Sequence, residues 1–391
     1  MRHWLFGSIL ALAAACPAQA ASAESEAFAK LEADYEAFLR AEDPITAGFE
    51  DDTTALSRLP DASAEADARR KAALEEFTRR IDALPANRLE GSAVFDRDYL
   101  AYEIADRLTA AGFDEARLAF QNDSGFHTLA SYLAYATVIR TPADGEAWLA
   151  RLAALPAWYD ENIKNLRRGV ETGWTQPKIV VDRVLEVAEG QAAAPIDTDV
   201  LLAPFATAPA TIDPATIAEM RTRAIALIRD QIRPRQEQFV AFLKDEYLPK
   251  ARASLAVIDM PGGEDWYEYQ ARHHTTTALT PDEIHDIGLA EVARIRGLMD
   301  GVMAETGFTG TFPEFLAFLR TDPQFYATSR QQLLEKASEI AKRSDDRLPG
   351  LFGTLPRLTY GVRPVPEDQE EGYTTGRYFP GSPQLGLAGG Y

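Results

Sequence analysis

The sequence predicts a mainly α-helical fold, a large helical bundle with a few short strands or extended segments. Three observations support this prediction. Apolar residues recur at helical spacing through most of the chain, and helix-start signals such as Thr141-Pro142-Ala143-Asp144 precede several of these stretches. In addition, 46% of the 391 residues are hydrophobic, which suffices for one large core or two moderate ones.

The N-terminal part is predicted to be a series of amphipathic helices. The first ends near Asp43-Pro44, because the residue before a proline is disfavoured in the helical conformation. Its apolar face consists of Phe28, Leu31, Tyr35, Phe38 and Leu39. Further helices are expected at about residues 63–84 and 93–111. The core stripe expected on the latter is Phe95, Tyr99, Tyr102, Ile104 and Leu108. Residues 128–139 are apolar or aromatic on most faces, which predicts an inner helix.

Proline and glycine mark the boundaries of the middle helices. Pro142 suits a first helical turn, and the segment that it opens extends to Gly169–Gly173. Residues 191–212 are rich in Ala and Pro without a sustained period, which predicts a surface excursion or subdomain boundary. Asp213-Pro214 caps the next helix, which Pro234 is expected to kink or break.

The strongest local signals lie between residues 260 and 310. Three consecutive β-branched threonines, Thr275 to Thr277, follow His273-His274 and favour a short extended segment. Thr280-Pro281-Asp282-Glu283 is typical of a helix start with a capping box, and this helix is expected to end near Glu305. The remaining elements are expected at residues 313–320 and 329–342 for helices and 357–362 for a short strand.

Residues 1–20 have the pattern of an export signal. Two basic residues precede an apolar run from Trp4 to Ala15, and Pro17–Ala20 supplies small residues at the cleavage site, so the mature domain is predicted to be 21–391. The only cysteine, Cys16, leaves open a lipoprotein signal in which it would be acylated. We therefore expect an exported, periplasmic protein, with a lipid anchor on Cys16 as the alternative.

Two features bear on the size and partners of the protein. The Gly-rich segment Leu385–Tyr391 is typical of the middle of a loop, which predicts that this chain is the front part of a longer protein. A formal charge of -20, from 60 acidic and 40 basic residues, repels a phosphate backbone and argues against nucleic acid as a partner. After the leader, the sequence contains no run of about 18 apolar residues, so no transmembrane helix is predicted there.

Familiar catalytic motifs do not occur in the sequence. The zinc-peptidase pentad His-Glu-x-x-His, which places two imidazoles one helical turn apart, is missing. The nucleophile elbow Gly-x-Ser-x-Gly and the phosphate-binding and dinucleotide-binding glycine motifs are missing as well. From this chain alone we expect no catalytic residue, no metal ligand and no cofactor.

Several ordered motifs nevertheless resemble the bacterial family known as domain of unknown function 885. The segments that carry the resemblance are Arg168-Gly169-x-x-x-Gly173-Trp174-Thr175-Gln176-Pro177-Lys178, His273-His274-Thr275-Thr276-Thr277-x-Leu279-Thr280-Pro281-Asp282-Glu283-Ile284-His285, Leu348–Pro356 and Tyr378–Ser382. The resemblance covers nearly all of the mature chain. It implies a mostly helical, often exported protein with a His-Glu-x-x-Pro-Gly-His-type segment beyond the region seen here, similar to zincin metallopeptidases whose helical bundles enclose a deep substrate channel.

The resemblance therefore implies a function for a longer protein of which this chain is one part. The chain is expected to be the N-terminal part of an exported zinc-dependent peptidase or amide hydrolase, inactive by itself, with zinc bound by the complete protein. It would supply channel walls and contacts to a peptide or amide substrate. The expected substrate-binding residues are His273, His274, Thr275, Thr276 and Tyr378.

Each of these expectations has an alternative that the sequence leaves open. In the functional interpretation, the extended segment pairs with a peptide backbone and His274 donates a hydrogen bond to a developing oxyanion. In the alternative, the threonines line a buried turn and His274 bonds to a backbone carbonyl. For the protein as a whole, the alternative is a non-catalytic exported helical binding or scaffold protein. The sequence does not predict the oligomeric state.

Overall fold

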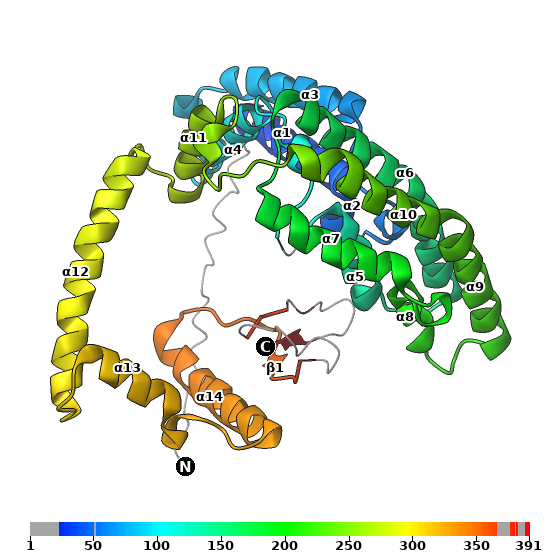
Figure 1. The fold of residues 1–391 in the computed structure, drawn as a ribbon. Helices are drawn as coiled ribbons and strands as arrows, with labels where there is room; N and C mark the ends of the chain where they lie inside the picture. The colour runs from blue at the N-terminus through cyan, green and yellow to red at the C-terminus, as the bar shows by residue number, and fades with distance from the viewer. Residues whose placement is uncertain (1–22, 51, 123, 366–375, 380, 382–387) are drawn as a thin grey trace, which may run out of the picture. The chain divides into compact units, whose positions relative to one another are not determined.

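The computed structural model describes residues 23–50, 52–122, 124–365, 376–379, 381 and 388–391. The predicted signal sequence and Cys16 lie outside these residues. The fold is mainly α-helical, as predicted (Figure 1). The α-helices are α1 Ala23–Glu42, α2 Pro44–Phe49, α3 Ala64–Asp82, α4 Ala93–Ala110, α5 Phe126–Ala136, α6 Pro142–Thr172, α7 Lys178–Ala193, α8 Ala203–Ala206, α9 Pro214–Leu227, α10 Arg233–Phe242, α11 Gly263–Thr275, α12 Pro281–Glu305, α13 Phe312–Thr321 and α14 Arg330–Leu351.

Short helical turns and two very short strands complete the described chain. The turns are η1 Thr53–Ser57, η2 Ala86–Arg88, η3 Glu115–Leu118, η4 Ile196–Thr198, η5 Val200–Leu202, η6 Ile228–Ile232, η7 Leu243–Tyr247, η8 Leu248–Lys250, η9 Val257–Asp259 and η10 Pro323–Phe325. The strands β1 Tyr360–Gly361 and β2 Gly389–Gly390 pair in parallel, with Tyr360 opposite Gly389. None of the described helices combines the length and apolar character needed to cross a membrane.

The chain divides into two compact units. The first contains residues up to Asp43, Leu59–Ile139 and Leu152–Ala253. The second contains Pro44–Arg58, Arg140–Arg151 and Ser254–Tyr391. The predicted boundary at residues 191–212 lies within the first unit, where the end of α7 is followed by η4, η5 and α8.

Two hydrophobic clusters contribute much of the core that the structure describes in the first unit. One lies between α1, α3 and α4, where Phe28, Leu31 and Tyr35 are buried against residues of α3 such as Phe77. The other lies between α6, α7 and α10, with Tyr159 and Phe239 among its buried residues. The predicted apolar face of α1 is thereby confirmed, and so are the limits of α3, whose N-cap Ser63 accepts a hydrogen bond from the amide of Ala66.

The predicted core stripe of α4 is wrong for its three aromatic residues. Phe95, Tyr99 and Tyr102 are exposed, whereas Leu100 and Ile104 are buried against α1 and α3. Both sides of α4 carry large apolar residues at helical spacing, so periodicity alone selected the wrong side. The same applies to α5, where Tyr132 and Tyr135 are exposed although the sequence predicted an inner helix.

Pro234 changes the helix without ending it. Residues of η6, directly before α10, adopt the π-helical hydrogen-bonding pattern, and Pro234 occupies the first turn of α10. A proline lacks the amide that an α-helix needs, and a π-helical turn accommodates this loss. A second π-helical stretch, η7, follows α10.

The second unit carries the helices that follow residue 260. The capping box of α12 is confirmed, because the amide of Glu283 donates to Thr280 Oγ1 at 3.2 Å and the amide of Thr280 donates to Glu283 Oε2 at 2.8 Å. Gly307 has a φ of +73°, which suits the end of this helix. Helix α14 continues past the predicted limit, to Leu351.

Candidate functional site

The predicted substrate-binding histidines lie in the last turn of α11. This helix begins after Gly262, and Tyr269 is its buried aromatic residue. The Tyr269 and His273 rings lie 5.8 Å apart, and the His273 and His274 rings lie 4.9 Å apart in an edge-on arrangement. Both histidines are exposed. The structure therefore brings the two imidazoles together at one helix end.

The predicted extended segment at Thr275–Thr277 is wrong. Thr275 is still helical, and its hydroxyl donates to the carbonyl of Ala271 at 2.7 Å. Thr276 is the C-cap, with a φ of +53° and an amide that donates to the carbonyl of Arg272 at 2.8 Å. The hydroxyls of Thr275 and Thr277 lie 2.9 Å apart. Local hydrogen bonds at the helix end thus outweigh the β propensity of the threonines.

The backbone at Thr276 is strained. A β-branched residue at positive φ is rare, because its side chain crowds the backbone there. Such strain costs on the order of 1–3 kcal/mol and is found preferentially at functional sites. Thr276 is exposed, so its side chain is accessible at the end of α11.

Tyr378 lies in the C-terminal strand region. Its ring is 6.5 Å from that of Tyr360 on β1. It also borders Gly389 on β2, where an added Cβ would lie 2.9 Å from the Tyr378 Cζ atom. The next residue, Phe379, pairs with Gly390 in an antiparallel bridge. The neighbours that the structure assigns to Tyr378 are therefore those of the small sheet.

The described residues do not fit a zinc site. Within the ranges that the structure covers, no group of three or more His, Cys, Asp and Glu side chains gathers in a way that could hold a metal ion. His285, in the second turn of α12, is exposed.

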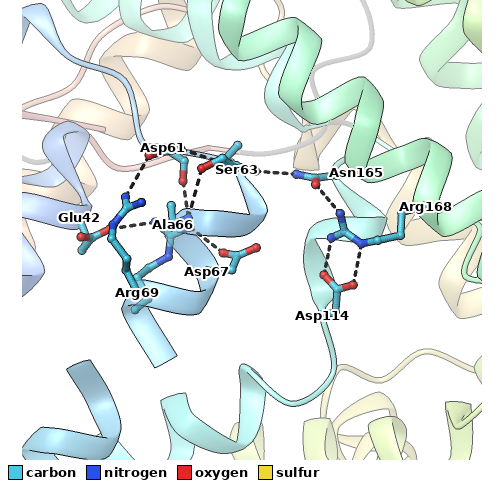
Figure 2. Close-up of polar contacts among 11 residues, drawn as sticks. Glu42, Asp61, Ser63, Ala66, Asp67, Arg69, Asp114, Asn165 and Arg168 are labelled. Atoms are coloured by element: carbon cyan, nitrogen blue, oxygen red, sulfur yellow. Dashed lines mark hydrogen bonds and ion pairs between the residues drawn. The ribbon is translucent and has the colours of Figure 1, made fainter. Parts of the chain in front are cut away.

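A polar network that sequence reasoning missed joins α3, α6 and the segment after α4, all in the first unit (Figure 2). The Arg168 guanidinium donates two hydrogen bonds, of 2.9 and 2.6 Å, to the carboxylate of Asp114. It also donates to Asn165 Oδ1 at 2.9 Å. Asn165 in turn donates to the carbonyl of Ala62 at 2.8 Å, beside the N-cap of α3.

The motif that begins at Arg168 forms the corner between α6 and α7. The amide of Trp174 donates to the carbonyl of Gly169 at 2.8 Å, and the Arg117 guanidinium lies 4.0 Å from the centre of the Trp174 ring. The Gln176 side chain donates to the carbonyl of Phe120 at 2.7 Å. A Cβ at Gly169 would lie 2.6 Å from the Trp174 carbonyl oxygen, so this position needs glycine. These contacts give the motif a structural role.

Buried polar side chains lie on α10 and next to it in the first unit. Arg233 and Asp199 form an ion pair of 2.9 Å, with the two side chains 9% and 5% exposed. Arg233 also donates to the carbonyls of Gln191 and Ala194 at the end of α7. Burial raises the pKa of the Asp199 carboxyl. Because a buried charge is costly without a partner, this pair holds η5 and the end of α7 to α10.

His127, on α5, is a further buried titratable group that the sequence did not single out. It packs among the rings of Phe120, Phe126 and Phe239, and only 2% of its surface is exposed. Among the described residues, Nδ1 has no hydrogen-bond partner. Burial lowers the pKa of this imidazole to about 4. His127 is therefore neutral at pH 7 in the folded protein.

Comparison with known proteins places this fold. A crystal structure described as that of a "putative lipoprotein from Colwellia psychrerythraea" matches with a TM-score of 0.82 and 18% sequence identity, over 94% of this chain and 67% of that chain. At this identity, the match shows a common fold. No curated protein matches the sequence. The family model described as "Bacterial protein of unknown function (DUF885)" matches residues 44–391, most of the chain, and the protein is therefore a member of that family.

Proposed function

We propose that this chain is the N-terminal part of an exported zinc-dependent peptidase or amide hydrolase. In this proposal the chain supplies channel walls and substrate contacts, and another part of the polypeptide carries the helix that binds zinc. Two relationships support the proposal. The chain belongs to the DUF885 family, for which the sequence motifs imply a resemblance to zincin metallopeptidases, and about a third of the Colwellia chain lies outside the match.

The observation that carries the proposal is the exposed apolar surface of α12 and α14 in the second unit. Helix α12 is 25 residues long and α14 is 22 residues long, yet neither buries a residue among those described. Large side chains such as Val292 on α12 and Leu333 on α14 are 67% and 62% exposed. Full burial of such a side chain contributes about 1.5–3 kcal/mol. A stable protein would cover these helices, as the walls of a larger bundle are covered.

The residues proposed to contact the substrate are His273, His274, Thr275 and Thr276, at the end of α11, and Tyr378. His274 is exposed, and its imidazole N–H is a suitable donor for the carbonyl or oxyanion of a peptide or amide. The proposal does not include pairing of a peptide backbone with residues 275–277, because Thr275 is helical and the segment is not extended.

The proposed location is the periplasm, reached through the signal in residues 1–20. The alternative is attachment to a membrane through a lipid anchor on Cys16. This alternative is worth testing because the Colwellia structure is described as that of a putative lipoprotein. Mass spectrometry of the mature N-terminus from the native host separates the two. A free N-terminus at Ala21 supports export without an anchor, and a diacylated Cys16 supports the lipoprotein.

The test of the function uses the protein purified from its native host. We expect stoichiometric zinc and hydrolysis of a peptide library, and we expect residues 21–391 produced alone to show neither. His274→Ala should reduce kcat by about 10²-fold or more if the imidazole stabilises an oxyanion. The matched control is His285→Ala, which removes another exposed histidine.

Two results would contradict the proposal. Hydrolysis that is insensitive to His274→Ala would remove the role of this residue. A zinc-free, inactive protein from the native host would favour the second candidate, a non-catalytic exported binding or scaffold protein.

A further inference from the structure

The apolar surface of α12 is a continuous stripe along one side of the helix. We call it the α12 stripe, and it consists of Ile287, Val292, Ile295, Leu298, Met299 and Val302. Each of these side chains is at least 41% exposed. Residues three and four apart lie above one another on a helix, so these six side chains form one surface. A large exposed apolar surface of this kind marks an interaction site.

The neighbouring helix in the chain does not cover the stripe. The aromatic residues of α13 pack with one another and with Phe308 before the helix, because the Phe315 ring lies 5.2 Å from Phe308 and 6.3 Å from Phe318. Its contact with α12 includes the Arg296 guanidinium, which lies 3.5 Å from the centre of the Phe312 ring. Arg296 is not part of the stripe. The contacts of α13 therefore leave the stripe open.

The pattern of the stripe indicates that a second helix covers it. The series Gly288, Val292, Ile295, Met299 and Val302 alternates steps of four and three residues, which is the spacing that packs against a nearly parallel or antiparallel helix. Gly288 leaves space at one end, since a Cβ at this position would have no atom within 4 Å. A small residue at such a position permits a close approach of the partner backbone.

We propose that the α12 stripe docks an amphipathic helix from a further part of the same polypeptide. The proposed source is the counterpart of the third of the Colwellia chain that the match leaves out. The size of that unmatched part is sufficient for several helices. This inference rests on one element of the proposed function, namely that the complete polypeptide is longer, and it does not depend on zinc or on hydrolysis.

The experiment places a benzophenone amino acid at Val292 in the protein expressed in its native host. The control carries it at Ala293, which is exposed and points away from the stripe. After irradiation, the cross-linked peptides are identified by mass spectrometry. Co-expression with an isotope-labelled copy separates links within one chain from links between two. We expect a link from position 292 to a peptide that lies C-terminal to residue 391 of the same chain, and loss of that link at position 293.

Every other product overturns the inference. A link to a second copy would make the α12 stripe a dimer interface. A link to residues 23–253 of the same chain would show that the first unit covers it. A link to a different protein, or no link at all, would show that no further part of the chain docks there. A protein that gives the expected link but neither binds zinc nor hydrolyses peptides would retain the docking site and contradict the proposed function alone.

Discussion

The stability of the first unit should depend on pH through His127. The perturbation is His127→Leu, which replaces a buried imidazole with an apolar side chain of similar size. In the folded protein the pKa of His127 is lowered from 6.5 to about 4 by burial, and in the unfolded chain it returns to its ordinary value. At a pH between these two pKa values, the unfolded chain binds a proton at His127 more readily than the folded protein does.

The sign and size of the effect follow from linkage. The stabilising contribution is complete above about pH 6.5, falls as the pH decreases, and is lost once the pH passes below about 4. A difference of about 2.5 pKa units corresponds to about 3 kcal/mol over the whole range, and about 2 kcal/mol of it is lost between pH 7.5 and pH 5.0. Protonation of His127 therefore favours unfolding of the packing among α5, α6 and α10.

The assay is urea denaturation of the purified protein at pH 7.5 and pH 5.0, followed by tryptophan fluorescence. Carboxylates also titrate near pH 5, so the informative quantity is the difference between wild type and variant. His127→Leu should lose about 2 kcal/mol less than wild type between the two pH values. The control, His285→Leu, removes an exposed histidine and should lose as much as wild type. Equal losses for wild type and His127→Leu would refute the reasoning.

Three further substitutions test the packing contacts. Gly169→Ala places a Cβ 2.6 Å from the backbone carbonyl oxygen of Trp174 and should lower the free energy of unfolding by about 2 kcal/mol or more. The control is Gly190→Ala on α7, where an added Cβ would have no atom within 4 Å. This control should raise the free energy of unfolding by about 0.5–1 kcal/mol in the same urea titration. Asp199→Ala leaves the buried Arg233 cation without its carboxylate and should cost about 3–5 kcal/mol; a cost below about 1 kcal/mol would mean that the pair is solvated. Thr280→Ala removes the cap of α12 and should cost about 1 kcal/mol, detected as faster amide hydrogen exchange in the first turn of that helix, and unchanged exchange would contradict the capping role.

Helix starts were the features that the sequence predicted best. Thr280 and Glu283 form their capping box, and Ser63 caps α3, because these hydrogen bonds join residues only three apart. The limits of α4 and α6 were likewise close to those expected. Such signals need no knowledge of the rest of the fold, since a helix end satisfies its free amides locally.

The side of a helix that is buried was predicted less well. On α4 the aromatic residues Phe95 and Tyr99 are exposed and Leu100 is buried. Both sides of the helix satisfy the same spacing rule, and the positions of α1 and α3 decide between them. Thr275 was placed in an extended segment for a related reason, because β propensity is weak compared with the hydrogen bonds of a helix that already exists.

By itself, the sequence determined the helical class, most helix limits and the motifs that identify the family, because these depend on residues that are near one another in the chain. Only the tertiary structure revealed that, among the described residues, the buried His127 has no hydrogen-bond partner for Nδ1. It also revealed that Arg233 forms an ion pair with Asp199 and that Arg168 donates hydrogen bonds to Asp114. These pairings join residues 34 and 54 positions apart in the chain. Their burial and charge depend on which helices pack together, and no local pattern encodes that choice.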